Sequence, residues 1–123
     1  QQMEAPFKKR LFPLRLYLAL EQTKRDGLED IVKWMPHGRA FKIEDKDKFT
    51  ERILEPYLQM KEYPTFVRQL NIYNFRRLSK ISGDDSSGAC YHEYFLRGRP
   101  ELVGRMERVV NKGTTVRPAI GSR

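Results

Sequence analysis

The sequence predicts an α+β fold with a three-helix core, a small antiparallel β-sheet and a short C-terminal helix. Apolar residues recur with helical spacing in three segments, and short runs of alternating apolar and polar residues lie beside two turn-rich segments. Seven Phe, six Tyr and one Trp among 123 residues supply enough large apolar side chains for one hydrophobic core. We therefore expect a single folded domain.

The first helix is expected over Phe12 to Gln22, and Asp26-Gly27 is a stop signal after it. A hairpin should follow, with one strand at Ile31 to Met35 and the return strand at Ala40 to Ile43. The residues between these strands include Pro and Gly, which favour a turn. The first part of the chain is therefore expected to be a helix followed by two antiparallel strands.

The second helix is predicted to begin after Asp45, because an Asp side chain caps a helix by accepting a backbone hydrogen bond. Its apolar stripe at helical spacing consists of Phe49, Ile53, Leu54 and Tyr57. Pro56 lies inside this pattern, where it removes one backbone hydrogen bond and clashes with the preceding turn. We therefore expect a kink or bulge near residues 52–55, with the helix ending near Met60.

The third helix should run from Pro64 or Thr65 to about Tyr73. A second hairpin is predicted from strands at Phe75 to Ile81 and Tyr91 to Leu96, and a last helix from Arg99 to about Val110. A helix-turn-helix followed by a β-hairpin is a winged helix. The expected core consists of Phe12, Leu16, Trp34, Phe41, Phe49, Leu54, Phe66, Leu70, Phe75 and Phe95.

Positive charge is concentrated in parts of the chain. Lys and Arg outnumber Asp and Glu by 24 to 16, and residues 63–83 contain four basic residues and no acidic one. This excess indicates an anionic partner, either a nucleic acid or an acidic surface. One Cys and two His are too few for a structural zinc site, and no phosphate-binding glycine loop is present, so no cofactor is predicted.

The single cysteine, Cys90, excludes an internal disulfide and fits a reducing compartment. No cation lies close to Cys90 in the sequence to lower the pKa of its thiol, so we expect it to be unreactive. No stretch approaches the ~18 apolar residues that a membrane span needs, and no membrane partner is expected.

The third helix offers side chains that suit DNA. An arginine such as Arg68 pairs with O6 and N7 of guanine, and amides such as Gln69 and Asn71 pair with adenine. Arg76 and Arg77 follow directly and suit phosphate contacts, which position a protein without reading sequence. A solvated surface is the alternative for one isolated arginine, but a block of cations without acids favours the binding of DNA.

The segment Thr65 to Arg77, with the sequence TFVRQLNIYNFRR, resembles the signature of the heat-shock factor DNA-binding domain. The resemblance extends to Trp34 with PHGRAF at 36–41, to the proline-bearing second helix, and to FLRGR at 95–99. It covers about residues 11–110. It implies a winged helix-turn-helix that binds double-stranded DNA at heat-shock elements, which are arrays of GAA units in alternating orientation.

The resemblance also implies roles for individual residues. Arg68 would read the guanine from the major groove, with Asn71 and Gln69 beside it. Further residues are expected to contact the DNA backbone: Thr65, Lys61, Tyr73, Arg76, Arg77 and Arg108. The wing, at about residues 80–91, is expected to face solvent or a neighbouring domain, and its Asp84-Asp85 pair would be repelled by phosphate.

Two residues depart from the family pattern. Asn74 replaces the glycine that is usual between Tyr73 and Phe75, and Asn is the residue that next best tolerates a left-handed backbone. Gln59 stands where the family usually has Lys, so one phosphate contact is lost and Lys61 is a candidate substitute. Both changes lie beside the third helix and bear on its specificity.

The chain is expected to comprise a basic arm at residues 1–10, the DNA-binding domain at 11–110 and a flexible tail at 111–123. The resemblance implies a nuclear transcription factor whose full-length form is a homotrimer, assembled through a region absent from these 123 residues. The domain alone should then be monomeric, or weakly dimeric on adjacent DNA sites.

Two other classes of function were weighed. A winged-helix protein-interaction module without DNA binding is disfavoured by the presence of Arg68, Arg76 and Arg77. A nuclease needs clustered carboxylates to hold metal ions. The densest acids lie at 44–47 and alternate with lysines, which suits the start of a helix rather than a metal site, so the protein is not expected to be an enzyme.

Overall fold

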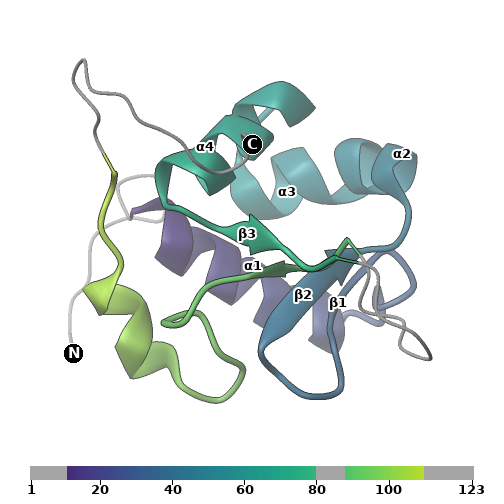
Figure 1. Ribbon diagram of the computed structural model, residues 1–123. Coiled ribbons are helices and arrows are strands. Elements are labelled where there is room, and N and C mark those ends of the chain that lie inside the picture. The colour runs from purple at the N-terminus through teal and green to yellow at the C-terminus, as the bar shows by residue number, and fades with distance from the viewer. Residues whose placement is uncertain (1–10, 80–87, 110–123) are drawn as a thin grey trace, which may run out of the picture.

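Helix α1 (Phe12–Arg25) lies behind a small sheet in the computed structural model, which describes residues 11–79 and 88–109 (Figure 1). The helix ends at Asp26 and Gly27, where Gly27 has a φ of 76° and the Asp26 N–H donates to the carbonyl of Gln22. The predicted helix stopped three residues too early, because the stop signal lies at the end of one further turn. Helix α1 contacts both the first strand and helix α3 (Glu55–Leu58).

The first hairpin is confirmed. Strand β1 (Val32–Trp34) pairs antiparallel with β2 (Ala40–Ile43), and Trp34 lies opposite Phe41. Strand β1 is one residue shorter at each end than predicted. At its C-terminal end, Met35 is already part of the turn, and its N–H donates to the carbonyl of Ala40. Two short strands, β3 (Arg76–Arg77) and β4 (Cys90–Tyr91), complete the sheet, whose order is β1-β2-β4-β3.

The second helix has the expected interruption. It begins with α2 (Lys46–Lys48), continues as the π-helical segment η2 (Phe49–Leu54), and returns to α-helix in α3 (Glu55–Leu58). The Oδ1 atom of Asp45 accepts the N–H of Lys48 at 3.0 Å, which confirms the predicted cap. The π-helical turns precede Pro56, where the ring would otherwise clash with the backbone one turn earlier.

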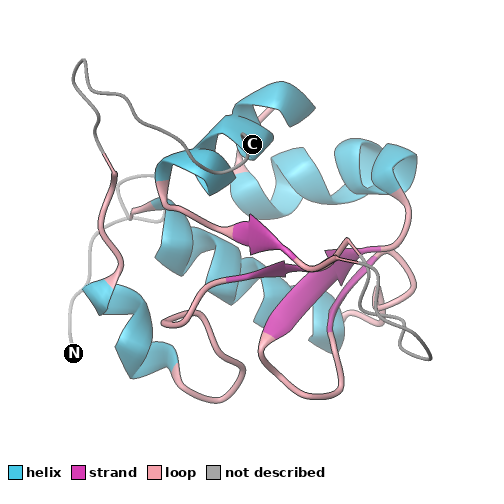
Figure 2. Cartoon of the chain, in the orientation of Figure 1, coloured by secondary structure: helices cyan, strands magenta, loops and turns pink. Residues whose placement is uncertain are grey.

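The helix that begins at α2 ends at Leu58 rather than near Met60, because Gln59 adopts a left-handed backbone with a φ of 57°. Helix α4 (Tyr63–Ile72) follows after four residues. The guanidinium of Arg15 in α1 donates to the carbonyl of Leu58, so α1 holds the end of α3 in place. Figure 2 shows α2, α3 and α4 gathered along one side of the strands.

The second hairpin differs from the prediction. Strand β3 (Arg76–Arg77) and strand β4 (Cys90–Tyr91) are short, and the strand expected at Tyr91 to Leu96 is wrong beyond its first residue. The N–H of Tyr94 donates to Nδ1 of His92, and the N–H of Phe95 donates to the carbonyl of His92, so this segment turns. The central part of the predicted wing, residues 80–87, lies outside the described residues.

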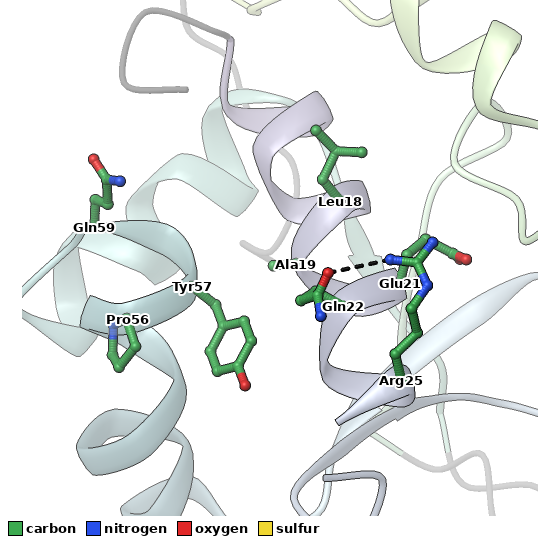
Figure 3. A pocket seen from close by; sticks show the side chains of 8 residues that line it. All are labelled: Leu18, Ala19, Glu21, Gln22, Arg25, Pro56, Tyr57 and Gln59. Carbon is green, nitrogen blue, oxygen red and sulfur yellow. Dashed lines mark hydrogen bonds between the residues drawn. The ribbon is translucent and has the colours of Figure 1, made fainter. Parts of the chain in front are cut away.

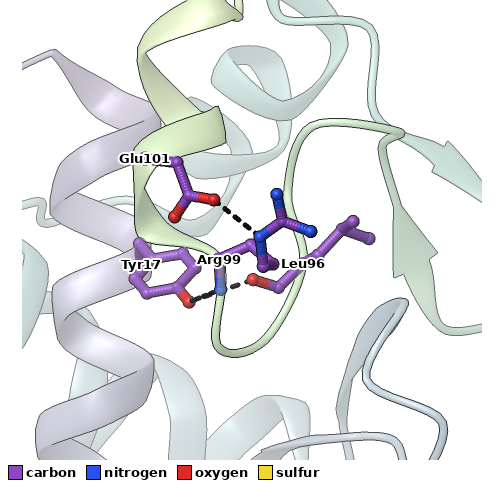
Figure 4. A network of polar contacts seen from close by, with 4 residues as sticks. All are labelled: Tyr17, Leu96, Arg99 and Glu101. Carbon is purple, nitrogen blue, oxygen red and sulfur yellow. Dashed lines mark hydrogen bonds and ion pairs between the residues drawn. The ribbon is translucent and has the colours of Figure 1, made fainter.

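The last helix is also shorter than predicted: η3 (Pro100–Arg105) is a 3₁₀-helix, and the segment after Arg105 is extended. It is joined to α1 by polar contacts (Figure 4). The Tyr17 hydroxyl donates to the carbonyl of Leu96 at 2.9 Å and accepts the N–H of Arg99 at 3.1 Å, and Arg99 pairs with Glu101.

The hydrophobic core lies between α1, the helices α2 to α4 and the sheet. All ten residues predicted for the core are buried. Four phenylalanines have 1% or less of their surface exposed and contribute most of its volume: Phe41, Phe49, Phe66 and Phe95. Tyr17, Trp34 and Phe95 pack together with ring centroids 5.2–5.6 Å apart. None of the described helices has the length and apolar character that crossing a membrane requires.

Candidate nucleic-acid interface

Helix α4 has one buried and one exposed side. Phe66 and Leu70 face the core, with 0% and 4% of their surfaces exposed. Thr65, Arg68 and Asn71 are exposed, and Gln69 is half-buried at the edge of this side. Since residues three and four apart share a helix face, the exposed residues form one polar strip along α4. The structure therefore brings four of the predicted DNA-contacting residues together on the surface.

The start of α4 is set by Glu62 and Pro64. Glu62 is extended, and its carbonyl accepts the N–H groups of Thr65 and Phe66, while Pro64 occupies the first turn, where a missing N–H costs nothing. Lys61 is exposed in the connection just before this point. The short connection therefore places an exposed lysine beside the N-terminus of α4, where the helix dipole also favours an anion.

Asn74 controls how the chain leaves α4. It has a φ of 65°, the N–H of Asn74 donates to Asn71, and the N–H of Phe75 donates to the carbonyl of Leu70. These two bonds with a left-handed residue form a Schellman motif, in which Gly or Asn is preferred. The prediction that Asn74 takes the left-handed conformation is thus confirmed. The motif turns the chain directly into β3.

Arg76 and Arg77 are both exposed on β3, but they interact with different neighbours. Successive residues of a strand point to opposite faces. Arg77 lies opposite Cys90 in the sheet and interacts with the side chain of Tyr63 at the start of α4. The charge of Arg76 instead acts on His92, whose pKa it helps to lower. The two arginines therefore extend the basic surface in two directions from the end of α4.

The ring of Tyr73 lies in the core at the end of α4. Only 3% of it is exposed, and its ring stacks on Phe12 of α1 with centroids 6.1 Å apart. Its side chain docks the end of α4 on α1, and the expectation that Tyr73 also contacts the DNA backbone stays a prediction. The helical spacing of Phe66, Leu70 and Tyr73 was the signal in the sequence that indicated a core position.

Arg108 lies at the other end of α4 from Lys61. The N–H of Val109 donates to the carbonyl of Ile72 at 2.8 Å, which brings the segment after η3 back to the C-terminal end of α4. Arg108 is exposed next to this bond. The C-terminal segment thus reaches the candidate interface as an extended chain, not as the helix that the sequence predicted.

The cations of the interface form no ion pairs with the described residues. Among residues 11–79 and 88–109, no ion pair involves Lys61, Arg68, Arg76 or Arg77; the pairs present join Lys33 and Lys42 to Glu44, and Arg99 to Glu101. The cations near α4 are therefore available to an anionic ligand. The described part of the chain has no cluster of three or more His, Cys, Asp or Glu that would hold a metal ion.

Cys90 lies beneath this surface. Only 6% of it is exposed, and burial raises the pKa of its thiol, while the charge of Arg77 opposes that shift. The sequence did not reveal that Arg77 approaches Cys90, because the pairing of β3 with β4 brings them together. Since burial has the larger effect on the pKa, the thiol is kept protonated, as expected of an unreactive cysteine.

A groove of about 420 Å³ lies between α1 and α3 (Figure 3). Leu18, Ala19 and Tyr57 contribute apolar surface, and Arg25 donates to the side chain of Gln22 along its edge. No residue of α4 or β3 lines it. The groove holds one arginine and one glutamate and lacks the clustered cations of the α4 surface, so we place the candidate site at α4.

Comparison with known proteins identifies the family. The family model described as HSF-type DNA-binding matches residues 12–109, which is most of the chain. The chain belongs to the HSF-type DNA-binding family. Within this family it is 32% identical over 108 residues to a heat shock factor protein of Xenopus laevis, and 30% identical over 114 residues to human heat shock factor protein 1.

These alignments cover 81% and 86% of this chain but 23% and 21% of the relatives, so the chain spans about a fifth of their length. Among solved structures, Chaetomium thermophilum Skn7 with SSRE DNA is similar, with a TM-score of 0.70, 26% identity and coverage of 81% of this chain and 100% of that one. The same protein with HSE DNA has a TM-score of 0.63 and 29% identity, covering 80% and 100%. The winged-helix fold of the HSF-type domain, with its four-stranded antiparallel sheet, is thus established for this chain.

Proposed function

We propose that this domain binds double-stranded DNA with α4 in the major groove and reads GAA units arranged as inverted repeats. The observation that supports the proposal most directly is the polar strip of α4, where Arg68 and Asn71 are exposed while the opposite side of the helix is fixed in the core. Arginine and amide side chains have the hydrogen-bonding geometry for guanine and adenine. The Skn7 structure with HSE DNA supports the same class of site.

Residues around α4 would contact phosphates and set the position of the helix. Thr65 and Lys61 lie at its N-terminal end, Arg76 and Arg77 follow it in β3, and Arg108 lies at its C-terminal end. Phosphate contacts of this kind fix orientation and register without reading sequence. Gln69, at the edge of the polar strip, assists Arg68 and Asn71 at the bases.

The domain is proposed to serve a nuclear transcription factor. In this proposal the full-length protein is a homotrimer, and the domain alone binds one GAA unit with modest affinity because it lacks the avidity of linked copies. On two adjacent inverted units the isolated domain would bind as a monomer or as a weak dimer. The DNA-binding family of the chain supports this role.

The test is a fluorescence-anisotropy titration with two duplexes, one holding two inverted GAA units and the other the same bases scrambled. Each titration is carried out at two salt concentrations, because binding through phosphates weakens with salt for every sequence. We expect a preference for the GAA duplex that persists at the higher salt. Equal binding to both duplexes that disappears with salt would refute sequence-specific recognition and leave a basic winged helix.

A further inference from the structure

Tyr63, the first residue of α4, lies between two cations from other elements. The Nζ atom of Lys46, in α2, lies 4.9 Å from the centre of the Tyr63 ring. Arg77, in β3, interacts with the same side chain through its charge and through a hydrogen bond. Side chains of three elements, α2, α4 and β3, thus interact at Tyr63, the first residue of the helix proposed to enter the groove.

The position of Lys46 is held by the surrounding structure. The Tyr63 ring packs edge-on against Phe49 at 6.1 Å and lies against Phe66 at 5.9 Å, so the ring over which Lys46 sits is fixed by the core. The Asp45 cap fixes the turn that carries Lys46. A cation held over an aromatic face loses less freedom when it binds a phosphate than one on a free side chain does.

The acidic groups near Lys46 do not neutralise it. Asp45 uses Oδ1 to accept the N–H of Lys48, and Asp47 and Glu62 are exposed. Within the described ranges 11–79 and 88–109, no ion pair involves Lys46. Its charge therefore remains available at Tyr63, the first residue of α4.

We propose that Lys46 is a DNA phosphate contact and acts together with Arg77 on neighbouring phosphates of one strand. Each strand of duplex DNA presents one phosphate per roughly 3.4 Å of helix axis, so two cations that act on one tyrosine side chain can each meet a different phosphate of the same strand. This inference rests on the proposed DNA-binding function. It adds a residue of α2 to an interface otherwise built from α4, β3 and their flanking segments.

The test compares Lys46→Ala with Lys48→Ala in the anisotropy titrations. Lys48→Ala removes the same charge from an exposed side chain two residues further along, whereas the cation–π contact with Tyr63 that the structure shows is made by Lys46. Loss of one phosphate contact lowers the slope of log K against log salt by about 0.9. For Lys46→Ala, the parent-to-variant affinity ratio should then fall about 3.5-fold between roughly 50 and 200 mM salt, equally on GAA and scrambled duplexes.

Lys48→Ala is expected to leave the slope at the parental value, and Lys46→Arg should restore it because the charge returns to the same place. Equal slopes for Lys46→Ala and Lys48→Ala would overturn the proposal. The parent chain separates the two hypotheses. If it shows no preference for GAA while Lys46→Ala still lowers the slope, the proposed specificity fails and the Lys46 contact stands.

Discussion

Arg68 is exposed on α4, and no ion pair within residues 11–79 and 88–109 engages its guanidinium. In the proposed complex it reads a guanine. Arg68→Ala should therefore weaken binding to the GAA duplex by ~1–3 kcal/mol and flatten discrimination at that base pair. Titrations against single-base variants of the duplex measure both effects. Arg25→Ala, at the end of α1, is the control for loss of one charge. If Arg68→Ala keeps the parental ratio of specific to scrambled binding, another residue reads the base.

Asn74 allows a prediction about backbone conformation. Because its φ is 65°, a side chain without the local hydrogen bonding of Asn is strained there. Asn74→Ala should lower the free energy of unfolding by about 1 kcal/mol, whereas Asn74→Gly should keep or raise it. Urea denaturation measures both variants. Asn71→Ala, on the exposed side of α4, should leave stability unchanged. Equal stability of Asn74→Ala and the parent would contradict the role assigned to this turn.

At the scale of elements, the segment between β4 and η3 depends on a neutral His92. Its Nδ1 accepts the N–H of Tyr94, and its ring packs between Phe75 and Tyr94 with centroids 5.7 and 5.8 Å away. Burial lowers the pKa of His92 below 6.5; the charge of Glu93 opposes the shift and that of Arg76 supports it. Protonation would remove the acceptor that forms the turn.

The sign of the pH dependence follows from that direction. Since the folded state has the lower pKa, the contribution of His92 is fully present above about pH 6.5 and is lost as the pH falls from there through the folded value. Urea denaturation at several pH values between about 7.5 and 5.5 should show this loss, in a range where most carboxylates stay ionised. His92→Asn keeps an acceptor and should reduce the loss, whereas His37→Gln should not. An unchanged pH profile in His92→Asn would exclude His92 as the cause.

The elements also show what the sequence allowed us to predict. Helix α4 and its exposed strip follow from Pro64 and from helical spacing, and the π-helical turns follow from Pro56. The second hairpin was harder to predict, because the aromatic run after Tyr91 has the composition of a strand. One side chain, His92, supplies the acceptor that turns it instead. A hydrogen bond of this kind leaves no periodic signal.

In the candidate site, too, local sequence patterns predicted some residues, while others depend on contacts between distant segments. The exposed residues of α4 were predicted because one helix carries them all, and local spacing decides which of them share a face. Tyr73 was assigned to the interface from the resemblance alone, whereas its helical spacing with Phe66 and Leu70 indicates the core position of its ring. Lys46 was not among the predicted contacts, because its approach to Tyr63 depends on the path of α2 and on the packing of Phe49. Contacts between distant segments require the assembled fold.

For the whole molecule, the polar contacts of Tyr17 join the first helix to the last described element. Its hydroxyl donates to the carbonyl of Leu96 and accepts the N–H of Arg99, which are 79 and 82 residues away along the chain. Only 4% of Tyr17 is exposed, and burial raises the pKa of its hydroxyl. The segment from 96 to 109, which returns to the end of α4 at Ile72, is therefore anchored on α1.

Tyr17→Phe keeps the ring in the core but removes both hydrogen bonds of the hydroxyl, while the N–H of Arg99 still donates to the carbonyl of Leu96. We expect it to lower the free energy of unfolding by roughly 1–3 kcal/mol, because each lost hydrogen bond contributes about 0.5–1.5 kcal/mol. Urea denaturation measures this change. Tyr57→Phe is the matched control, because the Tyr57 hydroxyl donates to Asp26 at an exposed site where water replaces the partner. It should cost well under about 1 kcal/mol.

The two variants also separate stability from DNA binding. Tyr17 lies away from the exposed strip of α4, so folded Tyr17→Phe should keep the parental preference for GAA duplexes at low temperature. The hydrogen bond from Val109 to Ile72 holds Arg108 near the end of α4, and it depends on the segment that Tyr17 anchors. If Arg108 contacts a phosphate, loosening this segment in Tyr17→Phe should lower the slope of log K against log salt. Equal stability losses in Tyr17→Phe and Tyr57→Phe would show that the buried contacts do not hold the C-terminal segment in place.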